Sequence, residues 1–253
     1  MAGVVGVIPA RYGSTRLEGK VLADIGGKPM IQHVWERAGR AKLIDDLIVA
    51  VDDRRVYEAA EKFGAHVIMT SPSHTCGTER VEEAVRKLDC GIAVNIQGDE
   101  PFIEPVTIDE AIQPLIDDPA LPMATVMRRI TSENDLQDPG VVKVVTDLNG
   151  LALYFSRSLI PYPRKRENLQ AFEHIGVYSF RKDFLSKFVK MKPTPLEQTE
   201  LLEMLRALEN GYRIKVVLTK HTGETLSVDT AQDLESARKL YERMVAHGRR
   251  KGK

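Results

Sequence analysis

The chain has 253 residues, a length that suits one α/β domain with an insertion or two small domains. Its 36 Lys and Arg residues balance 36 Asp and Glu residues, and 43% of the chain is hydrophobic. The balanced charge disfavours a nucleic-acid-binding protein, which usually carries a basic excess, while the apolar content is enough for a sizeable core.

Cysteine usage and hydropathy indicate a cytoplasmic protein. Cys76 and Cys90 are isolated from each other and show no disulfide-scaffold or metal-binding spacing. The first residues lack the features of a signal peptide, and no run approaches the roughly 20 apolar residues that span a bilayer. The short basic run at 249–253 is expected to be a solvated, disordered tail.

The N-terminal half alternates short apolar runs with amphipathic segments. The predicted strands are residues 3–8, 47–51, 66–69 and 91–96, and the predicted helices are residues 29–40, 54–63 and 78–88. This alternation is typical of βαβ units with a parallel sheet, in which ligands bind beyond the carboxyl ends of the strands. The polar segments 9–20, 52–55 and 97–100 follow three of these strands, so we expect them to line one cleft.

The pattern becomes rich in strands after residue 119. Strands are predicted at 123–128, 141–147, 151–156 and 174–180, with a hairpin at Asn149-Gly150. One helix over 195–210, a strand over 212–219 and a helix over 230–246 complete the chain. Asp229 or Thr230 is expected to cap that last helix, with Asp233 in its first turn. The predicted parts are therefore 1–120, 121–180 and 181–253.

The loop after the first strand, PARYGSTRLEGK, has the composition of a phosphate-binding turn. Arg11, Arg16 and Lys20 supply three cations within ten positions, and Ser14 and nearby glycines allow a close backbone approach. It is neither a Walker motif nor a GxGxxG dinucleotide fingerprint. On composition alone a solvated basic loop remains the alternative.

The segment NIQGDEP places Asp99 directly after a predicted buried strand. Mg²⁺ is usually held by one or two carboxylates together with substrate phosphates, so Asp99 is a candidate metal ligand. Gly-Asp-Glu-Pro is also favourable turn chemistry, and the residues alone do not separate the two interpretations.

Several motifs in order resemble the Kdo cytidylyltransferases, also called CMP-Kdo synthetases, where Kdo is 3-deoxy-manno-octulosonate. They are PARYGSTRLEGK, HTCGTER, NIQGDEP, YFSR, HIGVY, PLEQTELLEMLRAL and VDTAQDL, and together they span residues 3 to about 240. The resemblance implies a Rossmann-like nucleotidyltransferase fold of the glycosyltransferase-A type, a mixed sheet flanked by helices with a β-rich insertion. It also implies transfer of CMP from CTP to the anomeric hydroxyl of Kdo, with release of pyrophosphate.

The resemblance assigns roles to particular positions. Arg11, Lys20 and Asp99 become the catalytic residues, and Asp99 and Asp229 become ligands of Mg²⁺. The implied nucleotide-binding residues are Pro9, Ala10, Arg11, Ser14, Arg16, Lys20, Gly77, Thr78, Arg80, Gln97 and Asp99. The implied sugar-binding residues are Arg157, for the sugar carboxylate, and His174, Tyr178 and Glu203, for its hydroxyls.

Several of these residues also have a purely structural explanation. A histidine or tyrosine on a strand, such as His174 or Tyr178, is commonly a satisfied core residue, and Asp229 is also good helix-start chemistry. Arg80 lies in the first turn of a predicted helix, where a cation opposes the helix dipole unless it has another task.

The resemblance also implies a homodimer built through the β-rich part, a role in lipopolysaccharide synthesis, and CTP and an acidic eight-carbon sugar as partners. Met204 stands where many relatives carry Gln, so 8-amino-Kdo and acylneuraminate cytidylyltransferases remain alternatives. A non-catalytic CTP sensor on the same fold is an alternative of another class. A dehydrogenase is disfavoured because the GxGxxG fingerprint is missing.

Overall fold

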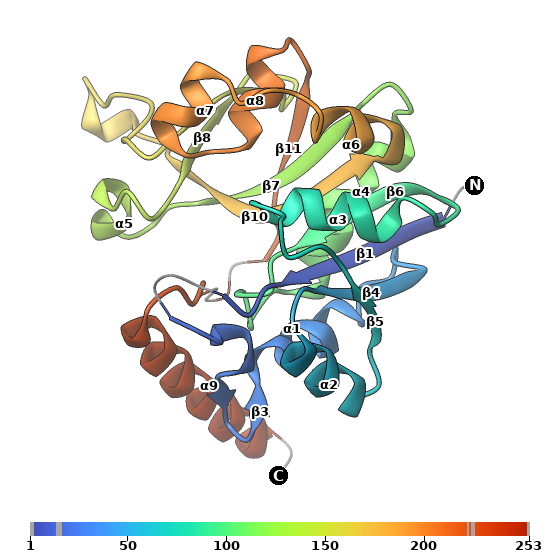
Figure 1. Cartoon of the computed structure of the whole chain (residues 1–253). Coiled ribbons are helices and arrows are strands. Elements are labelled where there is room, and N and C mark those ends of the chain that lie inside the picture. Colours follow the sequence, from blue (N-terminus) through green and yellow to red (C-terminus); the bar gives the residue numbers. More distant parts are fainter. Residues whose placement is uncertain (1–2, 14–16, 222, 224–225, 252–253) are drawn as a thin grey trace. The chain divides into compact units, whose positions relative to one another are not determined.

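The computed structural model describes residues 3–13, 17–221, 223 and 226–251 (Figure 1). The chain divides into two compact units, each assembled from separate stretches of sequence. Unit 1 comprises Met1–Val4, Asp89–Val94 and Val106–Thr222, and unit 2 comprises Val5–Leu88, Asn95–Pro105 and Gly223–Lys253. Strands β1 (Gly3–Ala10) and β6 (Cys90–Ile96) both begin in unit 1 and end in unit 2.

Unit 2 is built around parallel strands with helices beside them. β1 pairs in parallel with β4 (Asp46–Val51), and β4 pairs in parallel with β5 (His66–Met69). Its helices are α1 (Met30–Ala38), α2 (Arg54–Lys62), α3 (Gly77–Val85) and α9 (Ala231–Lys251). A short 3-10 turn η1 (Lys20–Leu22) and a small hairpin of β2 (Asp24–Ile25) and β3 (Lys28–Pro29) follow the loop after β1.

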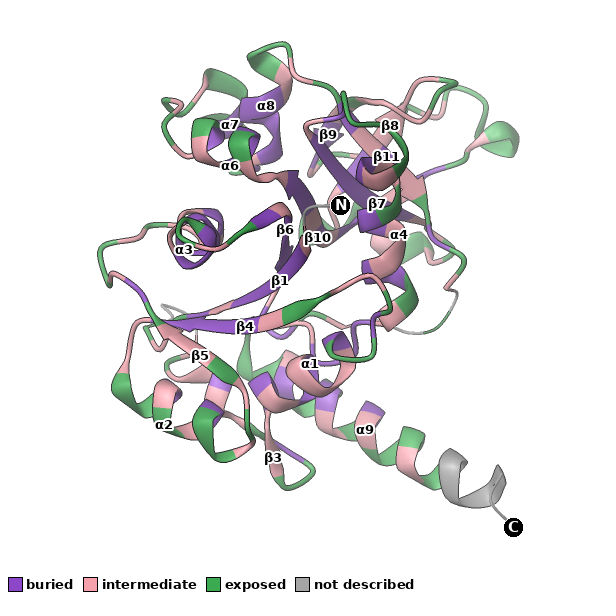
Figure 2. Ribbon diagram, turned by 90° about the vertical axis from the view of Figure 1, so that its right-hand side faces the viewer, coloured by how far each residue is buried: buried purple, intermediate pink, exposed green. Residues whose placement is uncertain are grey.

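Hydrophobic periodicity explains why the elements of unit 2 form where they do. β4 and β1 are almost continuously apolar and buried, as expected for strands covered on both faces. Helix α1 buries Met30, Ile31, Val34 and Ala38 at helical spacing. Figure 2 shows the buried residues following β1 and β4, whereas α2 and α9 carry many exposed residues. Gly64, with φ 83°, ends the α2 region in the left-handed conformation that glycine adopts without strain.

Unit 1 is a mixed sheet with helices. β7 (Met123–Arg129) pairs in parallel with β11 (Ile214–Leu218) and antiparallel with β10 (Phe172–Arg181). β8 (Lys143–Thr146) pairs antiparallel with both β10 and β9 (Ala152–Ser156). The remaining elements are α4 (Pro105–Asp117), α5 (Glu133–Gln137), η2 (Arg166–Asn168), α6 (Lys182–Phe188), α7 (Pro195–Glu200) and α8 (Met204–Glu209).

The predicted fold class, a mixed α/β sheet flanked by helices, is confirmed. The predicted hairpin is also present, because β8 and β9 flank a tight turn in which Gly150 has φ 72°. The Asp147 carboxylate shapes this turn by accepting the backbone N–H groups of Asn149 and Leu151, each at 2.8 Å. No helix among residues 3–13, 17–221, 223 and 226–251 is both long and apolar enough to cross a membrane.

Two element predictions are wrong. The single helix over 195–210 is two helices, because Leu201 takes the left-handed conformation at φ 53° and the helical hydrogen bonding stops there. The carbonyls of Glu200 and Leu201 instead accept hydrogen bonds from the Arg157 guanidinium, at 2.7 and 3.5 Å. The second error is the basic tail, because α9 continues to Lys251 rather than ending at residue 246.

Candidate active site

A pocket of about 280 Å³ lies in unit 2, beyond the carboxyl ends of β1 and β6. Parallel strands place the residues that follow them at one edge of a sheet, which is where ligands bind in such folds. The lining residues are Pro9, Arg11, Lys20, Val21, His74, Thr75, Cys76, Gly77, Arg80, Gln97, Gly98, Asp99 and Asp229. Of the three segments predicted to line one cleft, 9–20 and 97–100 contribute lining residues, whereas 52–55, after β4, contributes none of the described lining residues.

Lys20 bridges two aspartates that are far apart in the sequence. Its Nζ lies 2.7 Å from Oδ2 of Asp99 and 2.8 Å from Oδ1 of Asp229, and its side chain is only 11% exposed. Burial alone would lower the pKa of Lys20, but the two carboxylates outweigh burial and raise the pKa above its usual value. The two carboxylates thus converge on one cationic centre inside the pocket.

The backbone fixes the positions of these aspartates. The N–H of Val228 donates to the carbonyl of Asp99 at 2.9 Å, so the segment before α9 is joined directly to the segment after β6. Thr230 then caps α9, because its backbone N–H and hydroxyl donate to Asp233 and its hydroxyl accepts the Asp233 N–H. With Thr230 and Asp233 engaged in the cap, Asp229 directs a carboxylate oxygen at Lys20.

Two glycines allow the walls of the pocket to approach β1 closely. A Cβ on Gly98 would meet the carbonyl oxygen of Pro9 at 2.8 Å, a distance at which the backbone would have to shift. A Cβ on Gly77 would lie 3.3 Å from the Pro9 ring. The loop after β6 and the start of α3 therefore both pack closely against Pro9 at the end of β1, and all three segments form walls of the pocket.

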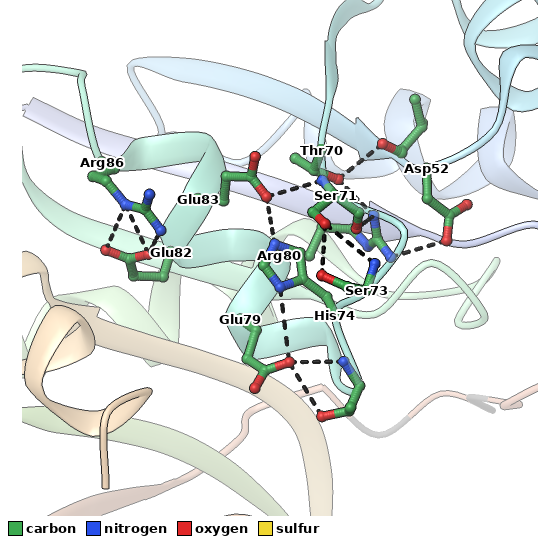
Figure 3. Close-up of polar contacts among 12 residues, drawn as sticks. Asp52, Thr70, Ser71, Ser73, His74, Glu79, Arg80, Glu82, Glu83 and Arg86 are labelled. Carbon is green, nitrogen blue, oxygen red and sulfur yellow. Dashed lines mark hydrogen bonds and ion pairs between the residues drawn. The ribbon is translucent and has the colours of Figure 1, made fainter.

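Arg80 lines the pocket, but much of its guanidinium is engaged within the protein. Nη2 donates to Oδ2 of Asp52 at 2.9 Å, and Nη1 donates to the Thr70 hydroxyl at 2.5 Å and to the Ser71 carbonyl at 3.4 Å (Figure 3). The side chain is 3% exposed. These contacts explain how a cation can lie in the first turn of α3, where it opposes the helix dipole. A contact between Arg80 and the nucleotide stays a prediction.

The rim of the pocket before α3 is organised by a histidine and two glutamates. His74 Nε2 bonds to the Glu83 carboxylate, which also accepts the backbone N–H of Ser71 at 3.0 Å (Figure 3). Glu79 accepts the backbone N–H of Thr75 at 2.7 Å. The Ser71 N–H and His74 hold the pKa of Glu83 below its usual value despite the opposing effect of burial. The segment from Ser71 to Thr75, which precedes α3, is therefore held against that helix by hydrogen bonds.

The predicted nucleotide-binding residues fall into three groups. Seven of them line the pocket, namely Pro9, Arg11, Lys20, Gly77, Arg80, Gln97 and Asp99. Ala10 and Thr78 are buried behind the lining, with the Thr78 hydroxyl accepting a hydrogen bond from Asn95 at 3.3 Å. Ser14 and Arg16 lie outside the described residues.

The sequence interpretation missed five individual lining residues, Val21, His74, Thr75, Cys76 and Gly98. The position of Asp52 directly after β4 led to the expectation that it lines the cleft. Instead, Asp52 accepts hydrogen bonds from Arg80 and from the backbone N–H of Tyr12, and it was this role that the sequence did not indicate.

The predicted sugar-binding residues all belong to unit 1 and are described there by themselves. Arg157 donates from Nε to the Glu200 carbonyl and from Nη1 to the Pro139 carbonyl, at 2.7 and 2.9 Å. Its backbone N–H and the hydroxyl of Ser156 both donate to the Glu200 carboxylate. Arg157 thus joins β9 to the end of α7, and its predicted contact with a sugar carboxylate stays a prediction.

His174 and Tyr178 lie side by side on β10, with ring centroids 5.1 Å apart, although a β-bulge separates them in the pairing with β7. His174 Nε2 bonds to the Thr125 hydroxyl at 2.9 Å, and the Phe155 ring meets the imidazole edge to face. Burial lowers the pKa of His174 to about 3, so the ring is neutral. This environment is that of a satisfied core histidine; a sugar contact stays a prediction.

The helix pair α7–α8 carries the last predicted sugar residue, Glu203, at the N-cap of α8. Glu197 is committed to a buried ion pair with Arg206, in which Nε lies 2.8 Å from Oε2. Met204 is 4% exposed and packs in the core of unit 1. The Met204 side chain therefore contributes to packing in this chain.

Comparisons with known proteins give the family. The cytidylyltransferase family matches residues 5–216. The 3-deoxy-manno-octulosonate cytidylyltransferase of Geobacter sulfurreducens is 51% identical over 92% of this chain and 96% of its own length. The protein of the same name from Solibacter usitatus is 50% identical, with 97% of each chain covered.

Solved structures agree with this. The structure of CMP:2-keto-3-deoxy-manno-octonic acid synthetase complexed with CTP is 44% identical, with a TM-score of 0.91, and covers 96% of this chain and 100% of its own. 4-Diphosphocytidyl-2C-methyl-D-erythritol synthase from Anaerococcus prevotii, at 16% identity and a TM-score of 0.62, shares the fold alone. The chain therefore belongs to the cytidylyltransferase family, among the nucleotidyltransferases named 3-deoxy-manno-octulosonate cytidylyltransferase.

Proposed function

We propose that the protein transfers CMP from CTP to the anomeric hydroxyl of Kdo, giving CMP-Kdo and pyrophosphate for lipopolysaccharide synthesis. The observation that carries this proposal is the convergence of Lys20, Asp99 and Asp229 in one pocket at the strand ends. Relatives of this name at 50 to 51% identity support the substrates, and a relative in complex with CTP supports the nucleotide.

In this proposal the chain acts by positioning and by electrostatics. The sugar hydroxyl attacks the α-phosphorus of CTP in line, its proton passes to solvent, and the bond to the β-phosphate oxygen breaks. Arg11 and Lys20 face the triphosphate and stabilise the charge that develops on the departing pyrophosphate. The start of α3, with Gly77, faces the cytosine. Side chains that hold both reactants in line provide much of the rate without a general base.

The donor set fits Mg²⁺. Two carboxylates that converge on one cation match an ion that is held by one or two protein carboxylates and completed by phosphates and water. The described residues contain no group of three or more His, Cys, Asp or Glu side chains placed to hold a metal, so an all-protein cage is not formed among them. Asp99 and Asp229 would hold Mg²⁺, which would neutralise charge on the phosphates of CTP.

The proposal includes a homodimer formed through the β-rich part and a cytoplasmic location. That part exposes the apolar side chains of Leu148, Leu153 and Tyr162, which a second copy would cover. Sedimentation of the purified protein at several concentrations tests the dimer, and a monomer at all of them would contradict it.

A pyrophosphate-release assay with CTP, Mg²⁺ and a panel of acidic sugars tests the proposed reaction. We expect release that depends on both CTP and sugar, with Kdo turned over faster than 8-amino-Kdo or N-acetylneuraminate. Preference for the amino sugar would replace the substrate in the proposal. CTP binding without pyrophosphate release from any sugar would favour a nucleotide sensor instead.

A further inference from the structure

Asp52 occupies a position between two parts of the pocket. It follows β4 directly, and its side chain is 14% exposed. Oδ1 accepts the backbone N–H of Tyr12 at 3.0 Å, and Oδ2 accepts Nη2 of Arg80 at 2.9 Å. One carboxylate therefore links the loop after β1 with helix α3.

On the loop side, Tyr12 contacts Gly19, the residue directly before Lys20. Its carbonyl accepts the N–H of Gly19 at 3.0 Å, and its ring lies 3.2 Å from where a Gly19 Cβ would be. The Arg55 guanidinium covers the ring, with Cζ 3.4 Å from the ring centroid. Because Gly19 immediately precedes Lys20, holding Tyr12 also holds the position from which Lys20 reaches Asp99 and Asp229.

On the helix side, Arg80 is a buried cation in the first turn of α3. The Thr70 hydroxyl that it contacts donates in turn to the Val51 carbonyl at 2.8 Å, so Arg80 is anchored at the ends of both β4 and β5. A guanidinium that is 3% exposed and lies against the helix dipole needs an anionic partner. Among the described contacts, Asp52 is the carboxylate that meets it (Figure 3).

We infer that Asp52 is a positioning residue that couples the triphosphate side of the pocket to its base side. The inference rests on the proposed function, in which the loop after β1 holds the phosphates and the start of α3 faces cytosine. Each oxygen of the carboxylate serves one side, so displacing either partner disturbs the other. Asp52 itself does not line the pocket.

The chemistry of the link requires a carboxylate rather than an amide. In Asp52→Asn the new side chain would accept one hydrogen bond through its oxygen and would present an N–H group to the other donor. The amide oxygen should turn toward the charged Arg80 guanidinium, so the partly buried Tyr12 N–H loses its acceptor, which costs stability. Asp52→Asn is therefore a nearly isosteric change that breaks one side of the link.

The experiment measures the affinities of CTP, UTP and CMP by calorimetry for wild type, Asp52→Asn, and the control Arg86→Met. The control removes another ion pair of α3, Arg86 with Glu82, in which Arg86 is 59% exposed. For Asp52→Asn we expect at least about tenfold weaker CTP binding, and we expect both the CTP-to-UTP and the CTP-to-CMP affinity ratios to fall. The control should keep both wild-type ratios.

A second variant separates positioning from stability. In Asp52→Asn with Arg80→Met no buried guanidinium is left unpaired, so the amide oxygen of the substituted side chain can accept the Tyr12 N–H. We expect this double variant to recover thermal stability and the CTP-to-CMP ratio while the CTP-to-UTP ratio stays low. Hydrogen exchange at the Tyr12 amide, measured without nucleotide, should be faster in Asp52→Asn than in wild type and slow again in the double variant.

Two outcomes would overturn the inference. The first is an Asp52→Asn protein whose two affinity ratios equal those of wild type and Arg86→Met. The second is a protein in which only one ratio changes in Asp52→Asn and the Tyr12 amide exchanges as slowly as in wild type. Wild-type protein is measured first, and failure of wild type to bind CTP would contradict the proposed function and the inference with it.

Discussion

The pocket of unit 2 and the predicted sugar residues of unit 1 satisfy their polar groups in different ways. In the pocket, charged side chains meet one another, as Lys20 meets Asp99 and Asp229. In unit 1, Arg157 donates to backbone carbonyls and His174 is neutral in an aromatic surround. Lys20 also donates to the Val228 carbonyl at 3.2 Å, but its two shortest contacts are with carboxylates. Groups paired mainly by charge can exchange partners with a charged ligand, whereas groups bonded mainly to backbone carbonyls support the chain around them.

The motif residues of this family therefore serve two purposes, ligand chemistry in unit 2 and structural support in unit 1. The pocket brings together three residues from distant segments, Lys20, Asp99 and Asp229. Because charged side chains from three separate segments meet there, their convergence indicates a functional site. Arg157 joins β9 to the interrupted helix pair α7–α8, so its presence is also explained by folding. Substitutions in the two units should therefore separate activity from stability to different degrees.

The largest effect is expected for Asp99→Asn. Loss of one carboxylate from the Lys20 centre should lower the rate of pyrophosphate release by about a thousandfold, since electrostatic groups at developing charge contribute on this scale. The melting temperature should stay near that of wild type, because Asp99 is partly exposed and its backbone contact with Val228 remains. The exposed substitution Asp89→Asn is the matched control, and a near-normal rate in Asp99→Asn would show that the metal assignment is wrong.

Arg157→Ala should change both stability and sugar use. Removing its hydrogen bonds to the carbonyls of Pro139, Glu200 and Leu201 should lower the free energy of unfolding by about 1–3 kcal/mol. If Arg157 also meets the sugar carboxylate, the apparent KM for Kdo rises more than that for CTP. Steady-state kinetics with either substrate varied checks this against the exposed control Arg164→Ala; a larger rise for CTP would relocate the sugar site.

His174 should make stability depend on pH near neutrality. Its folded-state pKa is lowered to about 3, so the unfolded chain takes up a proton below pH 6.5 while the folded chain does not. Stability from this residue is therefore lost as pH falls, by about 1.4 kcal/mol between pH 7.5 and 5.5. Urea unfolding of wild type and His174→Gln at both pH values tests this; His66→Gln, an exposed control, should keep the wild-type dependence.

The smallest effect is expected at Leu201, the described non-glycine residue with positive φ. Its side chain is 76% exposed, so little packing is lost on substitution. Leu201→Gly should be more stable than Leu201→Ala by about 1 kcal/mol, because glycine adopts this conformation without strain. Equal stability of the two variants would show that the turn between α7 and α8 is relaxed.

Much of this arrangement could be predicted from the sequence where local rules apply. The strands β4 and β5 fall close to where apolar runs predict them, and Asp99 follows its strand as expected. The break at Leu201 could not be predicted, because PLEQTELLEMLRAL has continuous helical propensity, and the Arg157 guanidinium that bonds to the Leu201 carbonyl lies some 44 residues away in the sequence. The pairing of Asp52 with Arg80 could not be predicted either, because no local sequence pattern joins the end of β4 to the first turn of α3.

In the proposed reaction Asp99 and Asp229 together hold one metal–triphosphate. Titration of Mn²⁺ into the protein with CTP, followed by electron paramagnetic resonance, tests this most directly for wild type, Asp99→Asn and Asp229→Asn. We expect tight Mn²⁺ binding by the wild-type complex and at least about tenfold weaker binding by each variant, because each variant lacks one of the two carboxylates. Mn²⁺ affinities in both variants equal to that of wild type would contradict it.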